Sequence, residues 1–323
     1  MTDRSVLIRV PATVGNFGGA AGCAALALDA ALNVRASMRR DGCVHIRYFG
    51  ENGEWVPRDS QNLAVRAMQA ALELKGLLFG GVDFEMYASA PVGVGFGSSS
   101  AAVWAGLLAA DRLYRLGFGE KALFDLADAL DPRGDNLRAA WSGGFVARFE
   151  ESASPAYHST VVPDDLALHV VIPEVSAVHK HEPAHPEAHC VDRSAFLNRA
   201  RTLSSFLAHA SDSGTPQFEE PLIGSAEKTV PGLDEALRVQ IPGVQAVFVC
   251  GSGPAIGFLA REQSVESVAA AMTDCFARHG VSSRRAMFRP ANSGARDWNA
   301  GGTEIRLAPP VGLDMPEHRS LFV

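Results

Sequence analysis

The stretch Pro91-Val92-Gly93-Val94-Gly95-Phe96-Gly97-Ser98-Ser99-Ser100-Ala101-Ala102 is the part of the chain around which the fold is organised. Its alternate glycines let the backbone adopt positive φ and approach a ligand closely. An apolar run over 103–113 follows, which predicts a helix whose first turn the serines can cap. Because a helix N-terminus has unpaired N–H groups and the positive end of the dipole, the stretch favours a phosphate site. A simple turn before a capped helix is the alternative interpretation.

The loop does not match the two common nucleotide-binding fingerprints. No lysine follows the glycines, which excludes the P-loop pattern. A dinucleotide fold needs an acidic residue about 20 residues further on, after a second strand. Glu120 lies near that distance, but an apolar helix and an arginine-rich turn precede it.

Composition limits the class of protein. The chain has 323 residues, enough for two domains, and 47% of them are hydrophobic. The net charge of −7 argues against a nucleic-acid partner or an anionic membrane surface. No apolar run reaches the length of a membrane span, and residues 1–10 do not resemble a signal peptide. Five scattered cysteines without a C-x-x-C pair indicate a reduced, cytoplasmic setting.

Hydrophobic periodicity predicts a mixture of strands and helices. The predicted strands cover 5–10, ended by Pro11, and 44–49, 82–88, 145–149, 166–172, 242–249 and 257–260. The predicted helices cover 62–78, 101–113, 121–129, 136–141, 192–210 and 265–279. The apolar segment 20–32 fits either a helix or a buried strand. A long loop at 175–190 contains His179, His181, His185 and His189. Prolines interrupt any helix there, so we prefer a solvated or substrate-contacting loop to a transition-metal site.

Two further loops have small residues at fixed spacing. Residues 11–18 read P-A-T-x-x-N-x-G, and Gly251-Ser252-Gly253-Pro254-Ala255 follows a predicted strand. The glycines of the second loop predict backbone amides that surround an anion. The three loops, in this order, resemble the three motifs of the GHMP small-molecule kinases. The resemblance implies a two-domain α+β fold. Residues 1–155 would form a ribosomal-protein-like N-terminal domain with a left-handed β-α-β crossover, and residues 156–323 a ferredoxin-like C-terminal domain.

The resemblance also implies ATP and Mg²⁺ as cofactors. The residues it assigns to ATP are Pro91, Gly93, Gly95, Gly97, Ser98, Ser99, Ser100, Gly251, Ser252 and Gly253. Asp131 stands where the family has a magnesium-binding Glu, with Ser98 or Ser99 as the partner hydroxyl. Carboxylate and hydroxyl oxygens suit Mg²⁺. A turn-capping role before Pro132 is the alternative for Asp131.

Within the family, the homoserine-kinase branch is the most similar. Asp135-Asn136 begins eight residues before Gly143-Gly144, as it does in that branch. The mevalonate-kinase branch has a catalytic Asp where this chain has Asn136, and an amide cannot take up a proton at neutral pH. The resemblance therefore implies catalysis without a dedicated base. Asp135 is the alternative base, although a structural carboxylate is the preferred interpretation.

The acceptor half of the family pattern is different here. The family's F-D is Ala21-Gly22, and its H-P-D-N is Arg133-Gly134-Asp135-Asn136. Its substrate loop T-K-E-A-R falls on His179 to Pro183, and its second arginine on Ile223. In the family, the two arginines at these positions bind the carboxylate of homoserine, and this chain has Pro183 and Ile223 in their place. Each hydrogen bond to a charged group that is lost is worth about 1.5–3 kcal/mol, so the affinity for homoserine should fall. We expect an altered acceptor pocket that contains Asn16, Arg133, His179 and Lys180.

These observations predict an ATP-dependent kinase that acts on a small hydroxylated metabolite. Its predicted catalytic residues are Asn136, Asp135 and Arg133. Arg133 and Lys180 would suit an anionic acceptor. Two alternatives stay open, a catalytically silent nucleotide-binding regulator and an ATP-dependent decarboxylase. Members of the family are often dimers, so a homodimer is one option for the oligomeric state.

Overall fold

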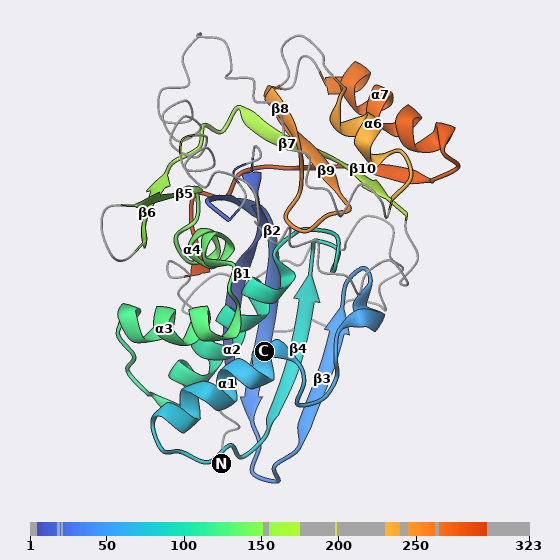
Figure 1. Cartoon of the computed structure of the whole chain (residues 1–323). Coiled ribbons are helices and arrows are strands. Elements are labelled where there is room, and N and C mark those ends of the chain that lie inside the picture. Colours follow the sequence, from blue (N-terminus) through green and yellow to red (C-terminus); the bar gives the residue numbers. More distant parts are fainter. Residues whose placement is uncertain are drawn as a thin grey trace.

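A six-stranded and a four-stranded sheet, with helices on one face of each, make up the computed structural model of the protein (Figure 1). The structure describes residues 5–17, 20, 22–150, 155–174, 198, 230–239, 245–261 and 265–295. No helix among these residues is long and apolar enough to cross a lipid bilayer.

The larger sheet has the order β3-β4-β2-β5-β6, and β1 pairs with β2. Its strands are β1 (Ser5–Gly15), β2 (Ala24–Met38), β3 (Val44–Phe49), β4 (Val82–Ala88), β5 (Phe145–Glu150) and β6 (Pro155–Thr160). The β3–β4 pair is parallel and the others are antiparallel. A parallel pair needs a crossover, and here the helix α1 (Leu63–Leu74) lies between the two strands in sequence.

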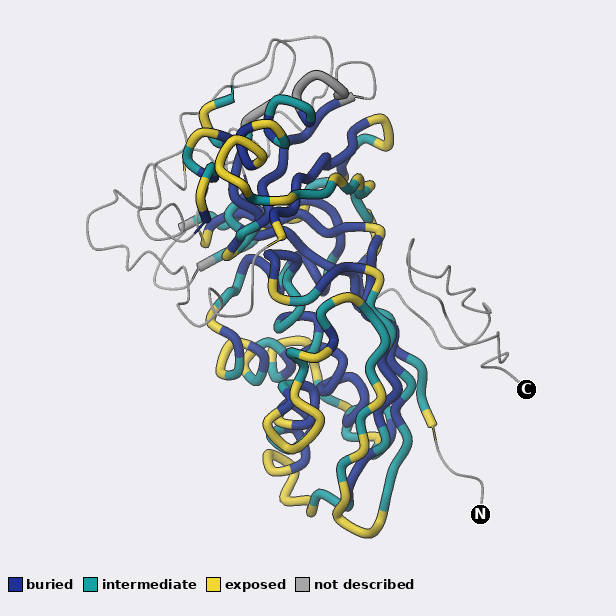
Figure 2. Tube along the Cα trace, turned by 90° about the vertical axis from the view of Figure 1, so that its right-hand side faces the viewer, coloured by how far each residue is buried: buried dark blue, intermediate teal, exposed yellow. Residues whose placement is uncertain are grey.

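Four helices pack together on one face of this sheet, and on the opposite face the outer strands β3 and β4 are partly exposed (Figure 2). They are α1, α2 (Ser98–Tyr114), α3 (Glu120–Leu130) and α4 (Gly134–Ser142). Helix α2 is mostly buried and lies at the centre, where Trp104 stacks on Trp141 of α4 with ring centroids 4.6 Å apart. Asn62 begins α1, because its side chain accepts a hydrogen bond from the Ala64 amide.

The smaller sheet has the order β10-β7-β9-β8 and is antiparallel throughout. Its strands are β7 (Leu166–Pro173), β8 (Gln245–Val249), β9 (Ile256–Arg261) and β10 (Ser283–Phe288). Two helices, α6 (Leu233–Leu237) and α7 (Val265–Arg278), share a core with one face of it. Its other face packs against the larger sheet in a continuous apolar core that includes Leu26, Phe145 and Leu168.

The structure decides between the two interpretations of segment 20–32, because residues 24–32 belong to the strand β2. Ala25 and Ala27 pack towards α4, whereas Leu26 and Leu28 belong to the core between the two sheets. Because both faces of the strand are buried, no alternation of polar residues was available to identify it.

Some sequence predictions were wrong or incomplete. Pro11 does not end the first strand, which continues to Gly15. The pairing register shifts between Pro11 and Thr13, and such an irregularity tolerates a residue without an N–H. Strands β6 and β10 were not predicted. The predicted helix 192–210 lies outside the described residues, apart from Asn198. The chain passes from one sheet to the other between Thr160 and Leu166, and the domain division at 155–156 stays a prediction.

Candidate active site

The glycine-rich stretch forms a loop that ends at the N-terminus of α2. Gly93, Gly95 and Gly97 have φ values of +76°, +108° and +65°. Gly97 is the residue that precedes the helix, and no side chain caps it. The prediction that the serines cap α2 is therefore wrong, because the hydroxyls of Ser99 and Ser100 donate to Asp131 instead. The first-turn amides, which have no partner within a helix, are left for a ligand.

The loop 91–97 lies directly against the third motif. A Cβ built on Gly95 would stand 1.8 Å from the carbonyl oxygen of Cys250, and one on Gly251 would stand 2.9 Å from that of Gly95. The Ala255 amide also donates to the carbonyl of Val94 at 3.3 Å. Only glycine permits two backbones to approach so closely. Pro91 and Gly253 are buried, and Ser252 is exposed.

The first motif completes the arrangement. The Thr13 amide donates to the carbonyl of Phe96 at 3.2 Å, and the Gly251 amide donates to the carbonyl of Gly15 at 2.9 Å. Asn16, with φ of 57°, donates from its side chain to the Gly251 carbonyl at 2.7 Å and accepts from the Gly22 amide at 2.9 Å. The three motifs thus form one main-chain assembly, and the Asn16 amide joins two of them.

Asp131 lies beside the start of α2 and is only 2% exposed. Its Oδ2 accepts from Ser99 Oγ at 2.9 Å and from Ser100 Oγ at 2.7 Å. Its Oδ1 accepts from Arg133 Nε at 2.9 Å. Burial by itself would raise the pKa of this carboxyl, but the charge and hydrogen bonds of Arg133, together with Ser100, outweigh it and lower the pKa. The carboxylate and the serine hydroxyls are oxygen donors of the kind that Mg²⁺ prefers.

Asp135 and Asn136 occupy the first turn of α4 and are buried. Asn136 Oδ1 accepts from the hydroxyl of Thr13 at 2.7 Å, and its Nδ2 would lie 2.2 Å from a Cβ built on Gly15. Asp135 Oδ1 accepts from the Asn136 amide, whereas Oδ2 has no hydrogen-bond partner among the described residues. Burial raises the pKa of Asp135. Both side chains therefore lie against the first motif.

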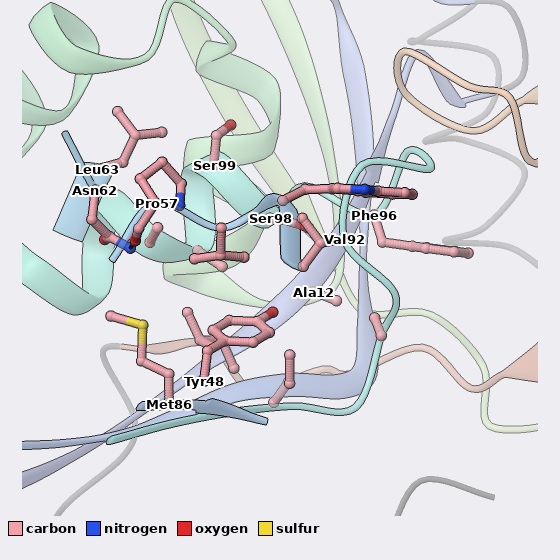
Figure 3. Close-up of a pocket in the computed structure, with 18 of the residues that line it drawn as sticks. Ala12, Tyr48, Pro57, Asn62, Leu63, Met86, Val92, Phe96, Ser98 and Ser99 are labelled. Carbon is pink, nitrogen blue, oxygen red and sulfur yellow. Dashed lines mark hydrogen bonds between the residues drawn. The ribbon is translucent and has the colours of Figure 1, made fainter. Parts of the chain in front are cut away.

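An apolar cavity of about 250 Å³ adjoins the loop. Figure 3 shows Pro57 and Asn62 on one side of it and Tyr48 and Met86 on the other, with Ser98 between the cavity and the loop. Trp55, of the short 3₁₀ helix η2 (Gly53–Trp55), also lines it. Burial raises the pKa of Tyr48, so its phenol stays neutral. Ser98 and Ser99 both line the cavity, and Ser99, together with Ser100, also contacts Asp131.

Sequence reasoning missed this cavity. Its wall comes from the strands β1 to β4, the 3₁₀ helix η2, the starts of α1 and α2, and the loops between them. The alternation of the strands shows only which of their residues are buried. An aromatic residue in the turn 53–55 was the one available signal. His179 and Lys180, predicted to contact the substrate, lie outside the described residues, as do the other loop histidines and Ile223.

Comparisons with known proteins identify the class to which this fold and site belong. The family model described as GHMP kinases N terminal domain matches residues 62–144. A curated relative from Streptomyces avermitilis is 31% identical over 276 residues, which cover 82% of this chain and 88% of the relative. The chain belongs to the GHMP kinase family, a class of small-molecule kinases.

The relatives narrow the class further. The relative from Streptomyces avermitilis is named homoserine kinase. A second relative with this name, from Streptomyces coelicolor, is 32% identical over 278 residues, which cover 82% of this chain and 88% of the relative. The chain is therefore a homoserine kinase-like member of the family. The solved structure of homoserine kinase from Cytophaga hutchinsonii matches with a TM-score of 0.70 at 21% identity, over 91% of this chain and 97% of that one. Mevalonate kinase from Methanococcus jannaschii matches with a TM-score of 0.63 at 12% identity, over 90% and 99% of the two chains. These two likenesses show the fold.

Proposed function

We propose that this protein is an ATP-dependent kinase that transfers the γ-phosphoryl group to a hydroxyl of a small metabolite. The observation that carries the proposal is the assembly of three backbone turns at the uncapped N-terminus of α2. Main-chain amides and a helix dipole together stabilise a polyphosphate without any lysine. We propose that the residues from Gly93 to Ser100 and from Gly251 to Gly253 bind the triphosphate.

The cavity supports a nucleoside next to these phosphates. It is apolar, it contains the aromatic residues Tyr48 and Trp55, and it reaches Ser98 at the start of α2. Aromatic faces stack on a base without requiring specific hydrogen bonds. The polar atoms of Asn62 are bonded to the Ala64 amide and the Pro57 carbonyl, so this residue shapes the wall of the cavity. We propose that the cavity binds the adenine base.

The residues around Asp131 fit a magnesium ion. Asp131 and Ser99 offer hard oxygen atoms beside the proposed phosphate site, and Asp131 is kept ionised by its low pKa. When bound, Mg²⁺ would neutralise charge on the β- and γ-phosphates. The protein's own contribution is to position the nucleotide and the acceptor and to exclude water, which phosphoryl transfer requires more than covalent chemistry.

The acceptor half of the family pattern differs in this chain, and we propose that the acceptor site is altered from that of the homoserine-kinase branch. Asn16, whose amide here joins two motifs, and Arg133, together with His179 and Lys180, are proposed to line its site. Asn136 is proposed to orient the acceptor from the buried edge of this site. Its amide cannot act as a base, and the neighbouring carboxyl of Asp135 has a raised pKa. A basic pocket of this kind suits an acceptor with a negative group.

We further propose that the two sheets mark two domains, divided near residues 155–156, with ribosomal-protein-like and ferredoxin-like folds. The order β10-β7-β9-β8, with α7 between β9 and β10, is the order of a ferredoxin-like sheet and supports the second assignment. The buried Cys275 forms no disulfide, which supports our proposal that the protein works in the reducing cytoplasm.

A screen of ADP release tests the function. Purified protein with Mg²⁺ and ATP is offered hydroxylated amino acids, including homoserine and threonine, and polyols. We expect acceptor-dependent ADP release that the double variant Ser98→Ala, Ser99→Ala abolishes, and phosphorylated product by mass spectrometry. Nucleotide binding without turnover of any acceptor would indicate a silent regulator instead. Release of carbon dioxide with ADP would indicate a decarboxylase, and either result would refute the kinase proposal.

A further inference from the structure

The carboxylate of Asp131 has no oxygen position left for a cation. Oδ1 accepts from Arg133 twice, from Nε at 2.9 Å and from the main-chain amide at 3.1 Å. Oδ2 accepts from Ser99, from Ser100 and, at 3.3 Å, from Nη2 of Arg133. A carboxylate offers about four lone-pair positions, and five donors surround this one. A divalent ion can therefore bind Asp131 only after some of these donors leave.

Arg133 is the donor that can leave. Its side chain is 34% exposed, whereas that of Asp131 is 2% exposed. Among the described residues, the guanidinium makes hydrogen bonds to Asp131 alone. Ser99 and Ser100 belong to the first turn of α2, so the backbone of the helix fixes their positions beside Asp131. Loss of the guanidinium would thus leave Asp131 oriented by Ser99 and Ser100.

We propose that Arg133 and a divalent cation compete for Asp131, so that binding of the cation releases the guanidinium to bind an anionic group of the acceptor. This inference rests on the proposed kinase function and adds a residue that couples two ligands. Before the metal binds, the arginine neutralises a buried carboxylate that would otherwise be unpaired and costly. After the metal binds, the arginine needs a new anion, and a carboxylate or phosphate of the acceptor would supply one.

Competition of this kind makes two affinities interdependent. Because coupling between two sites is reciprocal, the cation should strengthen binding of an anionic acceptor by the same factor that the acceptor strengthens binding of the cation. Removal of the guanidinium should tighten cation binding and abolish that coupling. A purely structural arginine would do neither, since its loss would only destabilise the fold.

Direct titration with Mn²⁺ in the presence of ADP tests the inference without any turnover. Electron paramagnetic resonance measures the concentration of free Mn²⁺ in each titration. The titration is carried out with the wild type, with Arg133→Met, with Arg133→Lys and with the control Lys121→Met. Lys121 pairs with Asp125 at 2.7 Å on the exposed side of α3, so its variant removes the same charge from another Asp partner. We expect Mn²⁺ to bind Arg133→Met roughly tenfold more tightly than wild type, Arg133→Lys to lie between them, and the control to be unchanged.

A second titration uses homoserine as the anionic probe. We expect Mn²⁺ with ADP to tighten homoserine binding severalfold in the wild type and not at all in Arg133→Met, with thermal unfolding to confirm that each variant is folded. Equal or weaker Mn²⁺ binding in both Arg133 variants would overturn the competition. If neither the wild type nor any variant binds Mn²⁺ with ADP, the proposed kinase site is refuted as well. The failure of the competition and the failure of the kinase proposal are therefore distinguishable.

Discussion

Replacement of Gly95 by alanine is the sharpest test of the main-chain assembly, because Gly117 offers a matched control. Both glycines have positive φ, +108° and +64°, so an alanine at either position carries backbone strain of roughly 1–2 kcal/mol. At Gly117 nothing lies within 4 Å of the new Cβ. At Gly95 the Cβ would be 1.8 Å from the Cys250 carbonyl, where contacts under 3.0 Å essentially never occur, so the turns must separate by about 1.2 Å.

That displacement is large for a site that works by positioning. A misplacement of about 1 Å can cost about 10²-fold in rate, which corresponds to about 2.7 kcal/mol in activation free energy. We therefore expect Gly95→Ala to lower kcat/KM about a hundredfold for ATP, measured by coupled ADP release, and to weaken binding of a fluorescent ATP analogue. Gly117→Ala should lower the thermal midpoint by a few degrees and leave kcat/KM unchanged. The reasoning is refuted if both variants lose activity equally, or if Gly95→Ala binds nucleotide as the wild type does.

Further predictions concern the cavity and the two carboxyl groups. Tyr48→Ala should weaken ATP binding by about 1–3 kcal/mol through lost stacking, measured by calorimetry, while Tyr48→Phe should bind normally. Nucleotide should change the fluorescence of Trp55, and Trp55→Phe should remove that change, since the stacked pair Trp104–Trp141 is buried in the helical core. The pKa of Asp135 is raised by burial, so its unfavourable effect on stability grows as the pH rises above the unfolded value of about 3.9 towards the folded pKa. Asp135→Asn should therefore raise the thermal midpoint at neutral pH, with no gain below pH ~4; an equal gain at every pH would contradict this account. The pKa of Asp131 is lowered, so its contribution is present above about pH 3.9 and is lost as the pH falls through the folded value. Asp131→Asn should cost about 1–3 kcal/mol in urea unfolding at neutral pH and much less in acid.

The assembly of the glycine motifs could be predicted from the sequence, because glycines at fixed spacing indicate turns and close backbone approach. Gly95, Gly97 and Gly251 allow close backbone approach, and their positions in three separated motifs predicted an assembly that the structure shows as direct contacts. Regular elements such as β3, β4 and α3 were also predictable, because in each one face is less exposed than the other and the apolar residues follow a clear period.

Other features depended on partners distant in the sequence. The role of the serines as donors to Asp131 requires a residue more than thirty positions away, and local capping preference suggested a different use. The cavity is formed by residues from β3, η2 and the start of α1, which no local pattern joins. Strand β10 was missed because two arginines stand in the middle of its short apolar pattern. In the structure one of them, Arg284, forms an ion pair at 2.5 Å with Glu51, in the connection between β3 and α1.

The apolar core between the two sheets has a consequence for work with fragments of the protein. Leu26 and Leu28 of one sheet share that core with Leu168 and Val170 of the other. A chain cut in the connection between β6 and β7 would leave each half with an apolar face exposed to solvent, and exposed apolar patches promote aggregation. Expression of either half alone should therefore yield inclusion bodies, and co-expression of both halves is the practical route to a split version of this protein.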